Sequence, residues 1–362
     1  MTDPKSDPRR RCLPLAEWPL ADQEAWYAAI RDGGLLDDRG LALHWRPETR
    51  RSVIAAYGRY LTFLDRTGAL DRSAGPDARL TPDRLRAYIS ELGTQVASVT
   101  QAGRIRDLAE ALRVMTPGAS YPYLVMARRR LKARARPTRN KRSRVVPTNR
   151  LVDLGLDLME RAETQPFKRE VWRACTYRDG LTILLLALRP IRRSNLAAMK
   201  LNQHLFKIGE AYQLAFDGTI TKNHRPYDRP LDPRLTPYIE RYLDHYRPAL
   251  VGAGESGYVW ISWRGIPMSE CSLYGKIVQH TKAAFGHSHS PHLFRDSDMT
   301  TLAELNPEHV WLGMSLFHHS DPRPSEEHYN HALDRTAVER FQDTIHKERR
   351  RIRGATRKSS LK

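Results

Sequence analysis

The chain has 362 residues, of which 40% are hydrophobic, so it is long enough for two domains and apolar enough to bury a core in each. Its longest apolar run, residues 181–188, is far shorter than the roughly 20 residues that cross a bilayer. The N-terminal sequence MTDPKSDPRRRC carries charge with no apolar segment behind it, which is not the pattern of a secretory signal. These features predict a soluble, cytoplasmic protein.

The charge balance is the most informative feature of the composition. The chain has 60 Lys and Arg residues against 41 Asp and Glu residues, a formal net charge of +19. Such a surplus favours a polyanionic partner, and nucleic acid is the first candidate. An acidic membrane surface is the alternative, but no basic amphipathic helix with an aromatic or leucine face stands out. Cys12, Cys175 and Cys271 form no CxxC pair and predict free thiols in a reducing compartment rather than a zinc site.

Two segments concentrate the basic residues. One runs from residue 128 to residue 144 without an acidic side chain, and the other is the C-terminal segment 347–362. A solvated helix surface and a disordered tail are the ordinary explanations of such runs. Because the first lies between two segments of regular periodicity, we expect it to be an interdomain connector that contacts DNA phosphates. The predicted DNA-binding residues of this basic connector are Arg128, Arg129, Arg130, Lys132, Arg134, Arg136, Arg139, Lys141, Arg142 and Arg144.

Before the connector, hydrophobic residues recur at helical spacing in four segments. Thr81 is a candidate N-cap, and Gly68 and Gly93 are expected to end the helices that precede them. Residues 1–140 are therefore predicted to form a small all-helical domain with basic outer faces. The four segments are 48–68, 80–93, 99–115 and 121–134.

After the connector, helical segments enclose a group of short β-prone pieces. Gly209-Glu210 and Asp217-Gly218 have the residue types of hairpin turns, and residues 257–265 are predicted to form a further strand. Residues 149–345 are predicted to form a mixed domain, mainly helical with a small antiparallel sheet, and 346–362 a basic tail. The expected helices are 149–163, 178–199, 269–286, 299–306 and 332–351, and the other β-prone pieces are 205–209, 211–216, 219–223 and 225–231.

Five polar signals follow one another in the second domain. An arginine follows the long apolar helix in RPIRRSNLAAMKL, a lysine lies in the hairpin TITKNHRPYDRP, and an H-x-x-R pair lies in SPHLFRD. A histidine and a tyrosine follow in HHSDPRPSEEHY. Singly, each is most simply a surface or packing residue. The residues are Arg192, Lys222, His292 with Arg295, His319 and Tyr329.

This order, with each residue in its expected local context, resembles that of the tyrosine recombinase (phage integrase) family. The resemblance covers about residues 150–332, and the helical domain before it is similar to the family's core-binding domain in position, size and basicity. It implies a mainly α fold, in which a helical, SAM-like core-binding domain precedes a mixed α+β catalytic domain with a small antiparallel sheet. It also implies a site-specific DNA recombinase of a mobile genetic element, associated with the bacterial nucleoid, that works as a tetramer on two duplexes.

The family's chemistry implies a role for each matched residue. Attack on a phosphodiester places negative charge on the non-bridging oxygens, and arginines stabilise that charge through bidentate hydrogen bonds. The resemblance implies a covalent 3′-phosphotyrosine intermediate, formed without metal, ATP or cofactor. The implied roles are a phosphate clamp of Arg192 and Arg295, a third hydrogen bond from His319, attack by Tyr329, general-base assistance by His292 and protonation of the leaving 5′ oxygen by Lys222.

The sequence departs from the family pattern in three places. A Phe-His pair replaces the usual Leu-Gly step before the late histidine, and alignment on H-S-D selects His319 rather than His318. Asn195 occupies a position where glutamate is common. Arg193 directly follows Arg192, and alignment on the N-L step selects Arg192.

Three other functions use some of the same residues. A type IB topoisomerase has the same residue types without a specific DNA site, although the helical N-terminal domain favours a recombinase. A DNA-binding protein with a decayed catalytic site is the second alternative, and the complete residue set argues against it. A metal site at HSHSPH is the third, where His287, His289 and His292 alternate without a nearby acidic or cysteine ligand that completes a set.

Overall fold

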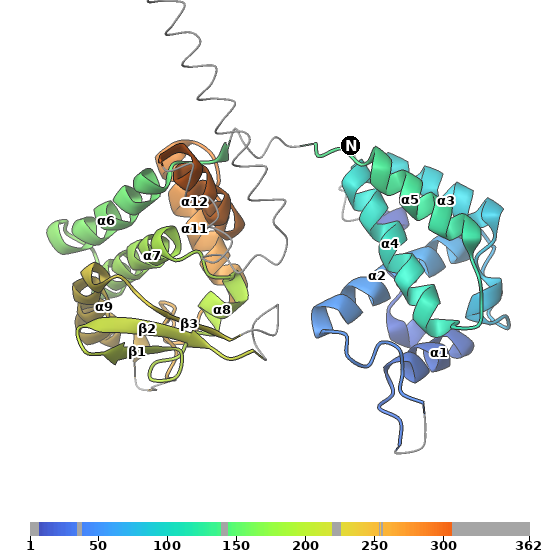
Figure 1. The fold of residues 1–362 in the computed structure, drawn as a ribbon, viewed down its shortest axis with the longest axis horizontal. Helices are drawn as coiled ribbons and strands as arrows, with labels where there is room; N and C mark the ends of the chain where they lie inside the picture. The colour runs from blue at the N-terminus through green and yellow to red at the C-terminus, as the bar shows by residue number, and fades with distance from the viewer. Residues whose placement is uncertain are drawn as a thin grey trace, which may run out of the picture. The chain divides into compact units, whose positions relative to one another are not determined.

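The computed structural model describes residues 7–34, 38–138, 144–218, 226–252, 254 and 256–305. The chain divides into two compact units, Met1–Asn140 and Lys141–Lys362 (Figure 1). Each unit has its own hydrophobic core. In the described part of the chain, no helix is long and apolar enough to cross a membrane.

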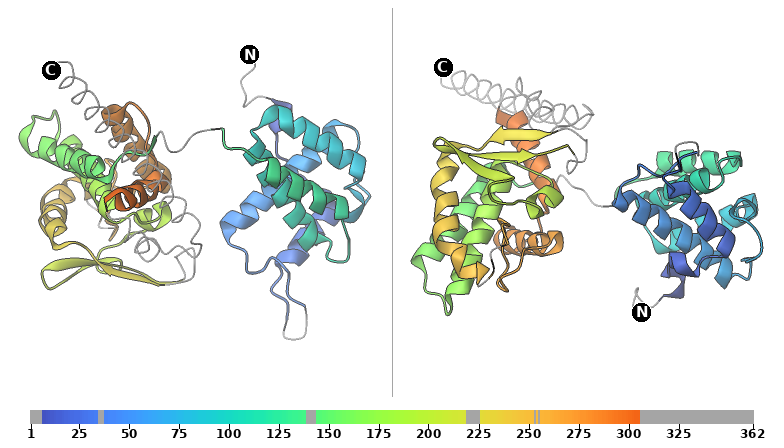
Figure 2. Two further views of the ribbon diagram at one scale, coloured as in Figure 1. Left: turned by 45° about the horizontal axis from the view of Figure 1, so that its top comes forward. Right: turned by 90° about the horizontal axis from the view of Figure 1, so that it is seen from below.

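The first unit is built from helices and turns throughout its described residues (Figure 2). Four of its helices occupy the four predicted segments, and one further helix precedes them. That helix was missed because it lacks an apolar stripe: Leu20 and Tyr27 are exposed, whereas the charged Asp22 is buried beside Trp26. The helices are α1 (Leu20–Ile30), α2 (Pro47–Arg66), α3 (Pro82–Gln95), α4 (Ser98–Met115) and α5 (Pro122–Arg134), with 3-10 turns at Pro8–Arg10, Leu15–Glu17 and Pro76–Ala78.

The helix ends of the first unit follow the predicted capping residues with one exception. The Thr81 Oγ1 accepts a hydrogen bond from the Arg84 N–H at 3.3 Å, and Gly68 takes a left-handed φ of 69° just beyond α2. The prediction that Gly93 ends α3 is wrong, because the helix continues to Gln95. A single glycine costs a helix only about 1 kcal/mol, so neighbouring hydrogen bonds and packing can carry the helix past it.

The core of the first unit is rich in aromatic residues and encloses a buried ion pair. Asp22 of α1 and Arg79 are both almost completely buried. The Arg79 Nε donates to the two carboxylate oxygens of Asp22 at 2.7 and 2.9 Å, and the Tyr57 hydroxyl donates to the same carboxylate. Tyr57 in turn packs edge-on against Trp18, with ring centroids 4.9 Å apart. The ion pair therefore ties α1 to the segment just before α3.

The second unit combines helices with a three-stranded antiparallel sheet of order β1-β2-β3 (Figure 1). The predicted hairpin turn at Gly209-Glu210 is confirmed, since Ile208 pairs with Ala211 across it and Gly209 has a left-handed φ of 59°. The elements are α6 (Thr148–Thr164), α7 (Glu170–Leu188), α8 (Arg193–Ala197), β1 (Leu205–Ile208), β2 (Ala211–Phe216), β3 (Tyr227–Pro230), α9 (Thr236–Arg241), α10 (Pro248–Val251), α11 (Glu270–Phe285) and α12 (Pro291–Leu305), with a 3-10 turn at Pro233–Leu235 and a π-helical turn at Tyr242–Tyr246.

The central strand anchors the sheet to the core. Along β2, the side chains of Tyr212, Leu214 and Phe216 are buried while their neighbours are partly exposed, which is the alternation of a sheet with one covered face. At the end of the strand, Phe216 pairs with Tyr227 of β3. The connection between β2 and β3 therefore leaves and rejoins the sheet at the same end of these two paired strands.

Two predicted elements of the second unit are corrected. Residues 178–199 do not form one helix: α7 ends at Leu188 and α8 begins at Arg193, because Pro190 between them has no N–H to continue the ladder. Residues 257–265 form no strand of the sheet. Their backbone groups bond elsewhere, the Val259 N–H to the carbonyl of Met199 and the Trp260 carbonyl to the Met268 N–H, each at 2.9 Å.

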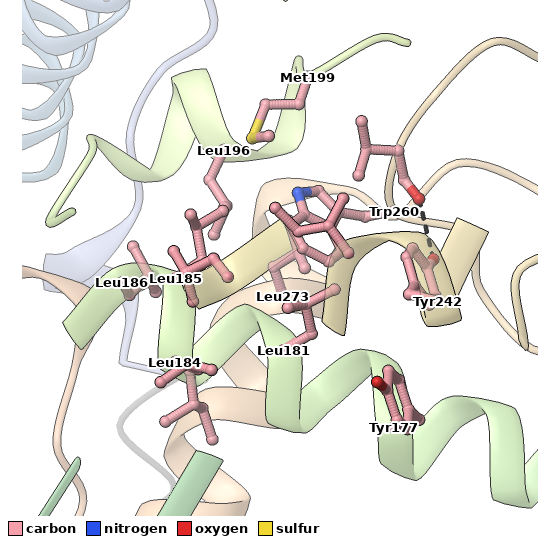
Figure 3. Packing of buried hydrophobic residues seen from close by; sticks show 14 of the residues in the cluster. Tyr177, Leu181, Leu184, Leu185, Leu186, Leu196, Met199, Tyr242, Trp260 and Leu273 are labelled. Atoms are coloured by element: carbon pink, nitrogen blue, oxygen red, sulfur yellow. Dashed lines mark hydrogen bonds between the residues drawn. The ribbon is translucent and has the colours of Figure 1, made fainter. Parts of the chain in front are cut away.

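Helices α6 and α7 cross at two glycines. A Cβ on Gly180 would lie 2.7 Å from the Gly155 carbonyl oxygen, closer than real Cβ atoms approach backbone oxygens. The glycines therefore allow the two backbones to touch, and α7 becomes the buried centre of the unit. Figure 3 shows its leucines packed with Trp260 and Leu273, where the Tyr242 hydroxyl donates to the Val259 carbonyl at 2.9 Å.

Candidate catalytic site

Arg192 and Arg295 come together through the break between α7 and α8. The Nε of Arg295, on α12, donates to the carbonyl of Pro190 at 2.9 Å, and Arg192 is the N-cap residue of α8. Burial, followed by the nearby positive charge of Arg192, lowers the pKa of Arg295 to about 10. Arg295 therefore stays protonated at neutral pH, and an anion bound beside the two cations would relieve their repulsion.

The neighbouring Arg193 has a different environment. Its Nε lies 2.9 Å from a carboxylate oxygen of Glu270 at the start of α11. Its guanidinium also lies over the ring of Tyr274, 5.6 Å from the ring centroid. Arg193 thus contacts α11, whereas Arg192 lies close enough to Arg295 for its charge to act there.

His292 lies in the first turn of α12, directly after Pro291. The spacing of three residues places it on the same side of the helix as Arg295. Its side chain is exposed, whereas Leu293 and Phe294 beside it are buried in the core. An exposed imidazole next to a half-buried guanidinium suits a site where a substrate arrives from solvent.

Asp298 is a site residue that the sequence did not indicate. It follows Arg295 by one turn of α12, and its carboxylate accepts a hydrogen bond from the Thr148 hydroxyl at 2.7 Å. Burial raises the pKa of Asp298 to about 7, although the bond from Thr148 and the charge of Arg295 oppose the rise. The only sequence signal was a second acidic residue after the H-x-x-R pair, in SPHLFRDSD.

Replacement of Asp298 by asparagine should change how stability depends on pH. The folded pKa of about 7 exceeds the ordinary value of 3.8, so the folded state binds a proton more tightly than the unfolded state. The stability that this proton contributes is complete below about pH 4 and is lost as the pH rises through about 7. Above that range the Asp298→Asn variant should be more stable than the original by up to about 4 kcal/mol, reduced where water screens the half-buried group.

Urea unfolding at about pH 5 and about pH 8 measures this difference. The gain of Asp298→Asn over the original chain should grow from the lower to the higher pH. Asp157→Asn, on the exposed side of α6, is a control for the amide substitution itself. A gain that stays constant with pH would show that Asp298 keeps its charge throughout.

Tyr227 borders the same site from the sheet. Burial raises the pKa of its hydroxyl, while the charges of Arg189, Arg229 and Arg295 act in the opposite direction. Arg295 on α12 and the first residue of β3 are therefore close enough to interact electrostatically. Lys222 belongs to the connection between β2 and β3 that ends just before Tyr227.

Three of the predicted catalytic residues lie outside the described residues. They are Lys222, His319 and Tyr329. The predicted turn at Asp217-Gly218 leads into the first of these regions, and the predicted helix 332–351 and basic tail belong to the last. The roles assigned to these residues stay predictions.

The basic connector begins on α5. Its six residues from Arg128 to Arg136 are exposed, and Arg128 also lies 3.0 Å from Glu110 of α4. Arg139, Lys141 and Arg142 lie outside the described residues. Arg144 is only half-exposed, since its guanidinium donates to the Ser288 hydroxyl at 2.7 Å and to the Ser288 carbonyl. The exposed arginines and lysine are available to phosphates, whereas Arg144 holds the end of the connector on the second unit.

The histidine tract has structural partners. His289 is completely buried, and its Nδ1–H donates to the Arg144 carbonyl at 3.1 Å while its Nε2 accepts from the Ser297 hydroxyl at 3.1 Å. Burial lowers the pKa of His289 to about 4, so the ring is neutral. Among the described residues, no group of three His, Cys, Asp or Glu side chains is placed to hold a metal ion. Both ring nitrogens of His289 are therefore already used within the protein.

Comparison with known proteins gave structural matches alone. No family model and no curated protein matches the sequence. The XerH site-specific recombinase bound to a palindromic difH substrate, a post-cleavage complex, matches with a TM-score of 0.57 and 14% identity over 92% of this chain and 99% of that one. Its pre-cleavage complex with difH matches with a TM-score of 0.53 and 13% identity over 80% and 78% of the two chains. A lambda integrase dimer bound to a core site matches with a TM-score of 0.52 and 14% identity over 80% and 91%.

These structures agree with the chain in architecture. Helices and a small antiparallel sheet occur in the order that the resemblance implied. The chain therefore has the fold of the tyrosine recombinases, and the predicted fold class is confirmed.

Proposed function

We propose that this protein is a site-specific DNA recombinase, which cleaves and rejoins DNA through a covalent phosphotyrosine intermediate. The observation that carries the proposal is that Arg192 and Arg295 lie close together on this fold. The exposed His292 lies on α12, the helix that also carries Arg295. The residue order that selected these side chains in the sequence also supplies a tyrosine, Tyr329, as the nucleophile. Residues 1–140 would form the core-binding domain and residues 149–345 the catalytic domain.

The two arginines would act on the phosphate. In the transition state of attack, negative charge grows on the two non-bridging oxygens. A guanidinium offers these oxygens two parallel N–H donors and keeps its charge, so it stabilises the transition state more than the ground state. Because Arg295 is held by the Pro190 carbonyl, its donors are oriented before the substrate arrives.

The remaining residues would move the protons. The Tyr329 oxygen attacks phosphorus and loses its proton with the assistance of His292, either directly or through the phosphate. The bond from phosphorus to the 5′ oxygen breaks, and that oxygen takes a proton from Lys222. The product is a 3′-phosphotyrosine, with His319 as a third hydrogen-bond donor to the phosphate. Attack by a 5′-hydroxyl reverses these steps, so religation needs no ATP.

The charge distribution supports double-stranded DNA as the substrate. The net charge of +19 and the exposed basic residues of α5 would neutralise phosphates along the duplex. The XerH and lambda integrase structures that match this fold are complexes with DNA. We propose that the two units clamp the duplex and that four copies assemble on two duplexes during the exchange of strands of a mobile element.

Trapping of the covalent intermediate tests this function. Duplexes are selected for binding from a randomised pool, and each selected duplex is then nicked at successive positions, so that the fragment beyond the cleavage point is lost and religation fails. The protein is expected to form a covalent adduct with a nicked duplex, and the Tyr329→Phe variant, which lacks the nucleophilic oxygen, is expected to form none.

The other outcomes of the same experiment overturn the proposal in different ways. An adduct on unselected DNA, accompanied by relaxation of a supercoiled plasmid, would indicate a topoisomerase. Selective binding with no adduct at any nick position would indicate a DNA-binding protein without catalysis. An adduct that persists in Tyr329→Phe would mean that another residue is the nucleophile.

A further inference from the structure

The end of the basic connector is fastened to the helix that carries His292 and Arg295. Residues 144–148 begin with Arg144, the last residue of the connector, and their polar groups bond to the loop before α12 and to α12 itself. These contacts join residues about 150 positions apart in the sequence, so they are tertiary contacts that hold one end of the connector. We call the segment 144–148 the connector anchor.

The first fastening runs through His289. Because a carbonyl can only accept, the Nδ1 of His289 carries the proton in its bond to the Arg144 carbonyl. The Nε2 of the neutral ring then accepts from the hydroxyl of Ser297, a buried residue of α12. The His289 N–H is itself held by the Thr281 hydroxyl of α11 at 3.0 Å. One buried side chain thus joins the anchor to α12.

The second fastening runs through Thr148, the first residue of α6. Its N–H donates to the Thr301 hydroxyl at 3.1 Å, and its hydroxyl donates to Asp298 at 2.7 Å. Both acceptors lie on α12, and Asp298 lies one turn from Arg295 and within range of its charge. The hydroxyl of Thr148 therefore holds a carboxylate that lies within the electrostatic range of Arg295, the guanidinium of the proposed phosphate clamp.

We propose that Thr148 is a positioning residue, which acts through Asp298 to hold α12 in register with the Arg192 loop when the connector binds DNA. This inference rests on the proposed recombinase function and adds a residue to it. The need for such a device follows from the site itself, because the nearby charge of Arg192 acts against the charge of Arg295. Catalysis by preorganised donors tolerates only small displacements of those donors, well under about 1 Å. The helix that carries Arg295 must therefore be held in place.

Thr148→Val removes the hydroxyl and keeps the shape of the side chain. We expect it to lower the single-turnover cleavage rate on a selected, nicked duplex at saturating DNA by about tenfold or more. The dissociation constant for the same duplex should change by less than about threefold, because Thr148 contacts no phosphate in the proposal. Thr148→Ser restores the donor and should restore the rate. Thr164→Val is the matched control, since its exposed hydroxyl bonds only to the Glu160 carbonyl within α6.

A second pair of variants covers the case in which Thr148→Val fails to fold. Asp298→Ala and Asp298→Asn both remove the negative charge, but only asparagine keeps an oxygen that can accept from Thr148. The alanine variant should therefore cleave more slowly than the asparagine variant by about tenfold.

The outcomes separate this inference from the function on which it rests. Suppose that the original chain cleaves DNA, that Thr148→Val and Thr148→Ser cleave at the same rate, and that Asp298→Ala and Asp298→Asn cleave at the same rate. Thr148 then has no positioning role. The same conclusion follows if Thr148→Val loses DNA affinity and thermal stability while the rate at saturating DNA is unchanged. If the original chain forms no adduct with any selected duplex, the recombinase function fails and this inference fails with it.

Discussion

Replacement of Arg295 by alanine is expected to lower the rate of DNA cleavage by about a hundredfold to a thousandfold. The loss should be of this size because Arg295 would supply donors to oxygens that gain charge only in the transition state. Arg192→Ala should have a similar effect, since the two guanidinium groups are close enough for one charge to lower the pKa of the other. Single-turnover formation of the covalent adduct, at saturating concentrations of a selected nicked duplex, measures both rates.

Arg193→Ala is the control for the clamp. It removes an equal charge one position away, from a side chain that bonds to Glu270 and lies over Tyr274. Its cleavage rate should stay within about threefold of the original chain. If Arg193→Ala lowered the cleavage rate strongly and Arg192→Ala lowered it little, the clamp residue would be Arg193 and not Arg192. An unchanged cleavage rate in Arg295→Ala would show that Arg295 does not act as a phosphate clamp.

Replacement of Asp22 by alanine is expected to destabilise the first unit by about 3–5 kcal/mol. The variant leaves the guanidinium of Arg79 buried without its carboxylate, and the Tyr57 hydroxyl without its acceptor. Arg79 would keep its bonds to the carbonyls of Asp71 and Ala74, but these do not neutralise its charge. Hydrogen-exchange mass spectrometry of the full chain in increasing urea reports the unfolding of this unit separately from that of the second.

Two further variants show whether the buried pair is the cause. Asp65→Ala removes an aspartate at the exposed end of α2, whose carboxylate lies 3.8 Å from Arg72, and should leave the unfolding of the unit almost unchanged. The double variant Asp22→Leu with Arg79→Met should be more stable than Asp22→Ala alone, because no unpaired charge remains. A double variant as unstable as the single one would assign the loss to packing instead.

Much of the fold could be predicted because it is encoded locally. The helix α2 has an apolar face at helical spacing, and the helix α3 begins at Pro82, directly after Thr81, whose side chain caps it. The helix α1 could not be predicted in this way, because its buried face includes Asp22, whose carboxylate accepts hydrogen bonds from Tyr57 and Arg79 far along the chain. The strand expected at 257–265 has the right composition, but tertiary hydrogen bonds take its backbone elsewhere.

The candidate site likewise has residues that the sequence predicted and residues that only the structure shows. Arg192, His292 and Arg295 were found from the order of residues in the sequence, and the structure brings the two arginines together. Thr148 and Asp298 were missed because their relation exists only after α6 and α12 have packed. A threonine at the start of a helix and an aspartate near the H-x-x-R pair are each unremarkable in a sequence.

The central claim is that Tyr329 forms the covalent bond to DNA. The most direct test is to trap the adduct on a selected nicked duplex, digest it with nuclease and protease, and locate the attached nucleotide by mass spectrometry. We predict a nucleotide 3′-phosphate on the peptide that contains Tyr329, with the fragmentation pattern of a phosphotyrosine. A nucleotide attached to any other residue, or attached through a 5′-phosphate, would contradict the account.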